Sequence, residues 1–109
     1  MSSSIRRVRE GQQPQGSREE IAYALTTTPW GSNPNTVEIT VFDVTAARGD
    51  ENWIDVTSTT TSGTLTVVGD VITTPLIVNL TPGRLYRVEI VFRAGVHRFV
   101  AWMEIRAER

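Results

Sequence analysis

The sequence predicts an all-β domain, an antiparallel sandwich of about seven strands. Three observations lead to this prediction. After residue 20 the chain is rich in Val, Ile and Thr, which suit a pleated, half-buried strand better than a helix. These residues form short runs separated by Gly, Pro, Asn and Asp, and no window shows apolar residues at helical spacing behind a capping residue. The 109 residues provide for a single core, so we expect one domain.

The expected strands can be placed along the chain. In one of them Val37, Ile39 and Val41 alternate with polar residues, which is the period of a strand with one buried face. Pro75 interrupts a later run and belongs at a bend or an edge, because proline cannot donate a ladder hydrogen bond. The expected ranges are 21–27, 36–44, 53–57, 63–68, 71–74, 76–80, 86–92 and about 98–106.

The last two expected strands form a hairpin with one buried face and one wet face. The turn lies at Ala94-Gly95, and on each side of it apolar residues alternate with charged ones. We therefore expect a core that contains Leu80, Tyr86, Val88, Ile90, Phe92, Phe99, Met103 and Ile105.

A corner motif precedes this hairpin, in the segment Leu80-Thr81-Pro82-Gly83-Arg84-Leu85-Tyr86. Leu80 enters the core, Pro82-Gly83 makes the turn, and the Tyr86 hydroxyl bonds backbone a few residues upstream. This is the pattern of the tyrosine corner in Greek-key sandwiches. The segment resembles the corresponding part of fibronectin type III domains, and the resemblance implies an immunoglobulin-like sandwich.

A narrower resemblance covers most of the chain after the N-terminal segment. It rests on Glu20-Ile21-Ala22-Tyr23, Thr28-Pro29-Trp30, Asp55-Val56-Thr57-Ser58-Thr59, the run from Val68 to Pro75, and the Arg-rich last strand. This order is similar to small structural proteins of tailed phages and prophages, described as fiber–tail adaptor proteins. The resemblance implies a virion component of the head–tail or tail–fiber region, made in the bacterial cytoplasm. Protein partners would then be further copies of the chain or other virion proteins. The chain lacks the cysteine found near the end of some relatives.

The N-terminal segment, residues 1–17, is predicted to be a flexible arm, and residues 18–109 the folded domain. Within the arm only Ile5 and Val8 are apolar between Ser, Gln, Gly and Arg residues. We expect its removal to leave the stability of the domain unchanged. The alternative is an arm that becomes ordered on a neighbouring subunit.

Catalytic, metal and cofactor sites are not expected. His97 is the only histidine and falls in a turn, where a solvated side chain is the simpler interpretation. Asp43, Asp50, Glu51 and Asp55 flank one turn, but their spacing matches no calcium loop. There is no cysteine, and the net charge of −1 gives no reason to expect nucleic acid or an anionic membrane as partner. No apolar run is long enough to span a bilayer, and we see no secretory signal.

Three tryptophans are candidate contact residues. Trp53 opens a short strand and is expected in the core, whereas Trp30 lies in a proline-flanked loop that could cover one end of the domain or face a partner. Trp102 falls on the polar face of the last hairpin, where an exposed aromatic residue is typical of an interface centre. The alternatives for Trp102 are a bulge that turns it inward or an arm that covers it. The candidate interface residues are Trp30, Val91, Arg93, Arg98, Val100, Trp102 and Arg106.

These observations favour a non-enzymatic protein that works by binding or assembly. The alternative is an adhesion or carbohydrate-binding module in which Trp30 and Trp102 would be stacking platforms. Such a module requires a route of secretion.

Overall fold

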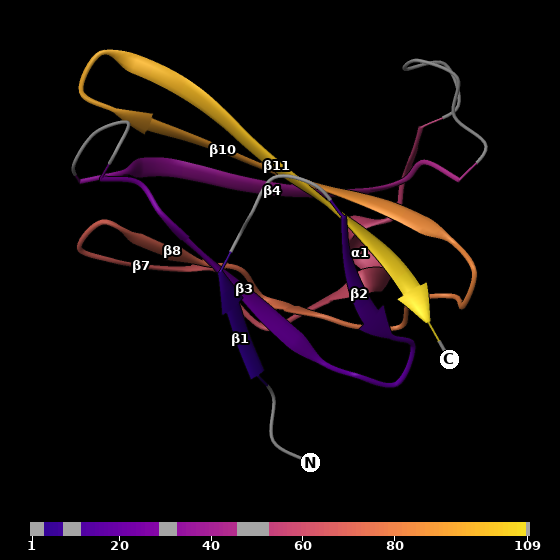
Figure 1. Ribbon diagram of the computed structural model, residues 1–109. Helices are drawn as coiled ribbons and strands as arrows, with labels where there is room; N and C mark the ends of the chain where they lie inside the picture. Colours follow the sequence, from indigo (N-terminus) through magenta and orange to yellow (C-terminus); the bar gives the residue numbers. More distant parts are fainter. Residues whose placement is uncertain (1–3, 8–11, 29–32, 46–52, 109) are drawn as a thin grey trace.

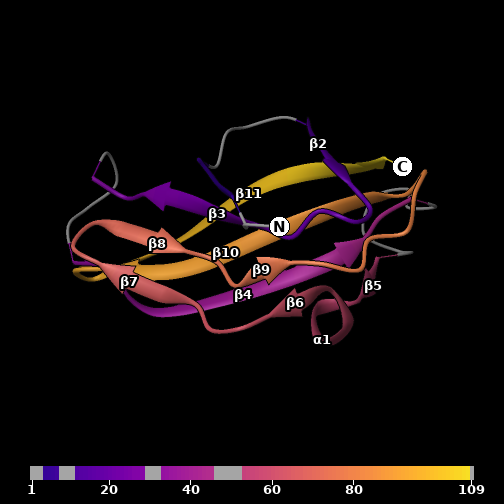
Figure 2. The same ribbon diagram turned by 90° about the horizontal axis from the view of Figure 1, so that it is seen from below.

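The protein is all-β and its strands form two facing sheets (Figures 1 and 2). The computed structural model describes residues 4–7, 12–28, 33–45 and 53–108, with the backbone alone for 4–7, 12 and 13. Within these residues there are eleven strands, β1 to β11, and one helical turn, α1. No helix of the described part is long and apolar enough to cross a bilayer.

The first sheet is built from short strands around β3, which spans Ile21–Thr26. β3 pairs antiparallel with β8 and β9 and parallel with β1. In order along the sheet its strands are β6 (Thr61–Ser62), β9 (Leu76–Ile77), β3, β8 (Val71–Thr73) and β7 (Thr66–Val68), with β1 (Ser4–Arg7) beside β3.

The second sheet has two long strands at its centre, β10 (Leu85–Ala94) and β11 (His97–Glu108). β10 pairs antiparallel with β11 on one side and with β4 (Asn35–Asp43) on the other. β2 (Gln12–Gly16) continues the sheet beyond β11 and runs parallel to it, and β5 (Ile54–Asp55) continues it beyond β4. The helical turn α1 (Thr57–Thr60) follows β5.

The core fills the space between the two sheets. All eight residues predicted from the sequence contribute to it, seven of them buried and Phe99 half-buried against the rest. The first sheet contributes Ile21, Tyr23, Leu25, Ile72 and Ile77, and the second adds Val41. The prediction of the core from strand periodicity is confirmed.

The expected strands are found close to their predicted places, with two differences. The sequence predicts one strand over 53–57, but the strand is only Ile54–Asp55 and α1 follows. The cause is local, because the Asp55 carboxylate accepts hydrogen bonds from the backbone N–H (2.9 Å) and the hydroxyl (2.6 Å) of Thr57 and so turns the chain. The chain also breaks into more strands than the expected seven, since bends divide the region from Thr61 to Ile77.

The N-terminal segment differs from the predicted flexible arm. β1 lies beside β3, and β2 pairs with the last residues of β11 from Glu104 to Glu108. The domain therefore begins before residue 18. Composition indicated an arm because the segment has few apolar residues, whereas backbone pairing and a buried polar side chain attach its described part.

That polar side chain is Gln15, which is 1% exposed and connects the two sheets. Its amide nitrogen donates to the Ile77 carbonyl at 2.8 Å and to the Glu19 carbonyl at 3.1 Å. Its amide oxygen accepts from the Tyr23 hydroxyl at 2.8 Å. A buried Tyr hydroxyl needs such a partner, because a buried polar group without one is costly.

Replacing Gln15 tests this attachment. In Gln15→Ala the Tyr23 hydroxyl and the Ile77 carbonyl lose a buried partner, so we expect the free energy of unfolding to fall by about 2 kcal/mol or more. Urea denaturation measures the change. Arg18→Ala, an exposed residue of the following turn, serves as the control and should unfold like the native chain. An unchanged stability in Gln15→Ala would instead support a flexible N-terminal arm.

Candidate interaction surface

The side of the second sheet that faces away from the core is called the outer face here. Side chains along β10 alternate between the core and this face, and β10 and β11 pair without a register shift from Leu85–Arg106 to Ala94–His97. Residues paired directly across two strands lie on the same side of a sheet. Trp102 pairs with Glu89 and therefore lies on the outer face. The alternative of a bulge that turns Trp102 into the core is wrong.

An apolar centre lies on this face. Val91 and Val100 are directly opposite each other, and Trp102 follows Val100 two residues along β11. Val100 is 55% exposed and Trp102 36%. The three residues that the sequence placed together are thus neighbours, and two of them expose substantial apolar surface.

Arg87 contacts two tryptophans that come from opposite sides of β10. Its guanidinium carbon lies 4.2 Å from the centre of the Trp102 ring and 5.0 Å from that of Trp53. Its Nε donates to a Glu89 carboxylate oxygen at 2.9 Å, and both side chains of this ion pair are largely buried. A guanidinium over an indole attracts its ring electrons, so Arg87 holds Trp102 in place on the outer face.

Trp53 is the residue that the sequence misplaced. It was expected in the core, but it is half-buried on the outer face, 5.4 Å between ring centres from Phe42. Phe42 pairs directly with Arg87. Arg87 is not among the candidate interface residues predicted from the sequence, although the alternation along its strand places it on the face opposite to the core. The hairpin register alone predicts that Arg87 and Trp102 lie on the same face. The contact between Trp53 and Arg87 depends on how β5 pairs with β4, which the local sequence does not indicate.

The three arginines predicted as interface residues do not lie together. Arg93 and Arg98 face each other at the hairpin end of the outer face, beside the Val91–Val100 pair. Arg106 is eight residues beyond Arg98, about 27 Å along an extended strand, and its guanidinium lies 3.5 Å from Glu108. Trp30 lies outside the described residues.

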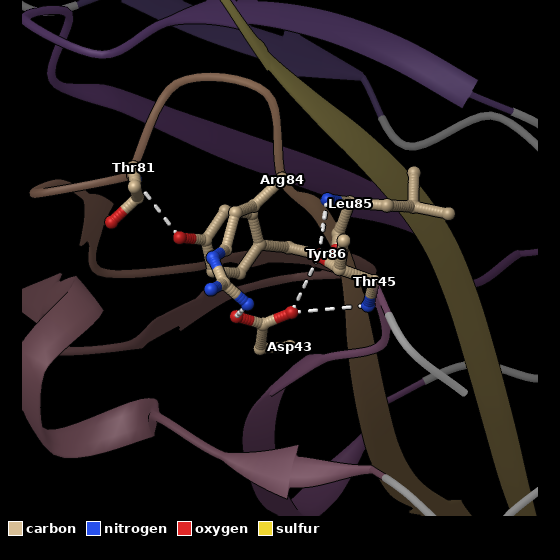
Figure 3. A network of polar contacts seen from close by, with 6 residues as sticks. All are labelled: Asp43, Thr45, Thr81, Arg84, Leu85 and Tyr86. Carbon is tan, nitrogen blue, oxygen red and sulfur yellow. Dashed lines mark hydrogen bonds and ion pairs between the residues drawn. The ribbon is translucent and has the colours of Figure 1, made fainter.

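The corner predicted around Tyr86 holds one end of the β10 strand (Figure 3). The Thr81 backbone N–H donates to the Tyr86 hydroxyl at 2.9 Å, and Leu80 is buried. Gly83 has a φ of 85°, a left-handed conformation that favours glycine, and its N–H donates to the Ala107 carbonyl. The expected roles of Leu80, Pro82, Gly83 and Tyr86 in a turn and corner agree with this geometry.

An acidic network adjoins the corner. Asp43 pairs with Tyr86, and its carboxylate accepts hydrogen bonds from the Thr45 hydroxyl (2.7 Å) and N–H (3.0 Å) and from the Arg84 guanidinium (3.1 Å). Burial alone would raise the pKa of Asp43, but the Thr45 hydrogen bonds and the Arg84 charge outweigh it and lower the pKa below 3.8. The network joins the ends of β4 and β10 through the Leu85 N–H, which donates to the Thr45 hydroxyl.

The remaining candidate groups for chemistry are separated. His97 is exposed at the start of β11, and the Asp55 carboxylate is bonded to Thr57, which lowers its pKa. Asp50 and Glu51 lie outside the described residues. Among the residues that are described, no three His, Asp or Glu side chains are grouped as metal ligands would be.

Comparison with known proteins gives little to add to this geometry. No protein-family model matches the chain, and no curated protein sequence matches it significantly. Among solved structures the chain is similar to the solution structure of amebosin, with a TM-score of 0.45 and 10% identity over 99% of this chain and 100% of that chain. A likeness at this level supports no functional argument.

Replacing Tyr86 by Phe tests the corner. The change keeps the ring in the core but leaves the Thr81 N–H without its partner, so we expect a loss of about 1 kcal/mol in the free energy of unfolding. Thr81→Ala removes an exposed side chain and keeps the N–H, so it is the matched control. Equal stability of the Tyr86→Phe and native chains would show that the hydroxyl contributes nothing.

The Asp43 network should make stability depend on pH. A carboxyl whose pKa is lower in the folded state stabilises that state above its unfolded value, near 3.8. This contribution is lost as the pH falls through the lower folded value. We therefore expect Asp43→Asn to be destabilised at neutral pH and to approach the native chain in stability at acid pH. Glu38→Gln, an exposed outer-face change, is the control. A destabilisation by Asp43→Asn that does not vary with pH would contradict this account.

Proposed function

We propose that this protein is a non-enzymatic assembly domain that binds protein partners through the outer face of its second sheet. The observation that carries the proposal is the apolar centre of Val91, Val100 and Trp102, in which Val100 and Trp102 are exposed. Covering such surface yields roughly 25 cal/mol for each Å² removed from water. Singly exposed apolar residues are ordinary, but an exposed valine and an exposed tryptophan beside the half-buried Val91 are typical of a binding surface.

The surroundings of Trp102 support the same proposal. Arg87 already orders the indole, so a partner would meet a rigid aromatic side chain and lose less conformational entropy on binding. Charged residues surround the apolar centre, with Arg93 and Arg98 at one end and Glu38 beside Val91. A central tryptophan with a charged rim is the usual composition of an interface.

The topology supports a more specific proposal, an immunoglobulin-like sandwich. β4, β10 and β11 lie in one sheet, β3 and β8 lie in the other, and β2 runs parallel to the last strand. The tyrosine corner lies in the connection from β9 of the first sheet to β10 of the second. Immunoglobulin-type domains also divide their strands between two facing sheets, which supports this proposal.

The identity of the partners rests on the sequence. The resemblance to phage and prophage adaptor proteins favours a virion component, made in the bacterial cytoplasm, that contacts further copies of itself or other virion proteins. The alternative, a carbohydrate-binding module, has less support. The Arg87 guanidinium covers only one face of the Trp102 indole, so the preference for a protein partner over a sugar rests on the sequence resemblance.

Trp102→Ala tests the proposed function. Truncation of a central interface tryptophan typically costs 2 kcal/mol or more of binding, about thirtyfold in affinity. We expect the variant to remain folded and to lose self-association or partner binding by this factor, as measured by light scattering and sedimentation. Val68→Ala, on an exposed residue of the first sheet, is the control and should assemble like the native chain. Unchanged assembly in Trp102→Ala would rule out the outer face as the interface.

A further inference from the structure

Among the described residues, one edge of the second sheet has no neighbouring strand for part of its length. β11 pairs with β10 along ten residues, but its other side pairs with β2 only from Glu104 onward (Figure 1). Within the described part of the chain, the edge from His97 to Met103 therefore has no strand beside it. Proteins commonly protect such edges with proline, lysine or a bulge. This stretch contains neither residue, and its pairing with β10 is regular.

The residues of this edge include an unbalanced charge. Arg98 and Arg93 are paired directly, and like charges in this position destabilise a sheet. Neither has an ion-pair partner among the described residues. Along β11, Arg98 lies two residues before Val100 and Trp102 lies two residues after it. The Trp102 indole can attract a guanidinium. The edge thus presents a cation and an aromatic ring at equal distances from Val100.

We propose that a second copy of this chain adds its own β11 edge here, antiparallel and centred on Val100. This inference rests on the proposed function and specifies its partner and geometry. Counted over the described residues, the open edge runs from His97 to Met103, and Val100 is its middle residue. Antiparallel pairing about that point places Arg98 of each copy opposite Trp102 of the other, with the two Val100 side chains facing each other.

Other registers fit less well. A centre at Phe99 or Ala101 leaves five of the seven open residues paired and moves Arg98 away from the second copy's Trp102. If the axis instead lay between two residues, outer-face residues of one copy would pair with core-face residues of the other. This follows because a shift of one residue moves every side chain to the opposite face of the sheet. The Val100 register uses the whole edge and keeps both outer faces on one side. It also gives an aromatic partner to each Arg98, which has no ion-pair partner among the described residues.

The absence of cysteine makes this register directly testable. In Val100→Cys the two thiols would face each other across the axis, within the range that a disulfide or the shortest bifunctional maleimide can join. We expect mild oxidation to convert most of the protein to a covalent dimer. Val96→Cys is the control, because Val96 is 88% exposed in the hairpin turn. In this register two such thiols would lie about 27 Å apart and should not cross-link.

Arginine substitutions provide a second readout. Arg98→Ala removes two symmetric cation–π contacts, so we expect roughly tenfold weaker dimerisation in sedimentation experiments. Arg106→Ala is the matched control, since it removes an exposed arginine of the same face that lies beyond the open edge.

The outcomes separate this inference from the proposed function. Failure of Val100→Cys to cross-link, or equal cross-linking by Val96→Cys, overturns the edge register. If Trp102→Ala still weakens assembly in that case, the outer face remains the interface and only the edge pairing is wrong. If Val100→Cys does not cross-link and Trp102→Ala assembles like the native chain, both proposals fail.

Discussion

The alternation of side chains along β10 is the constraint on which both the core and the outer face depend. β10 lies between β4 and β11, so its inward residues, from Tyr86 to Ala94, meet the first sheet across the core. Its outward residues, Arg87, Glu89 and Val91, form the middle of the outer face. A slip of one residue would bury these charges and expose the core, and for this reason the hydrophobic pattern specifies the register strongly. The same pattern that folds the domain therefore positions its candidate surface.

Polar side chains attach the ends of this framework. Gln15 joins β2 to the first sheet, Tyr86 joins the corner to the strand that follows it, and Asp43 joins β4 to the start of β10. Each interaction satisfies a group that would otherwise lose hydrogen bonding to water on folding, and no buried side-chain nitrogen or oxygen of the described residues lacks a partner. Apolar packing provides the bulk of the core, whereas these bonds decide how the segments around it are connected.

On the outer face, unlike on an ordinary solvent-exposed sheet surface, several side chains are held in place by contacts with one another. Arg87 is held by Glu89 and contacts both Trp53 and Trp102, so the two indoles are fixed from the middle strand of the sheet. Arg93 and Arg98, by contrast, face each other without such a partner in the described structure. One part of the surface is therefore satisfied internally and another part is not. The proposed pairing with a second copy uses this latter part of the surface and the neighbouring edge of β11.

The sequence by itself determined the all-β class, the final hairpin, its core residues and the tyrosine corner, because these follow from period-two patterns and turn residues close together in the chain. It also placed Val91, Val100 and Trp102 on one face, since the hairpin register relates them. Only the tertiary structure decided that Gln15 is buried against Ile77, 62 residues away, and that Trp53 approaches Arg87 on the outer face. A polar segment such as 12–17 gives no apolar signal, and the position of Trp53 depends on how β5 meets β4. Such contacts are made between strands distant in sequence, so local periodicity does not specify them.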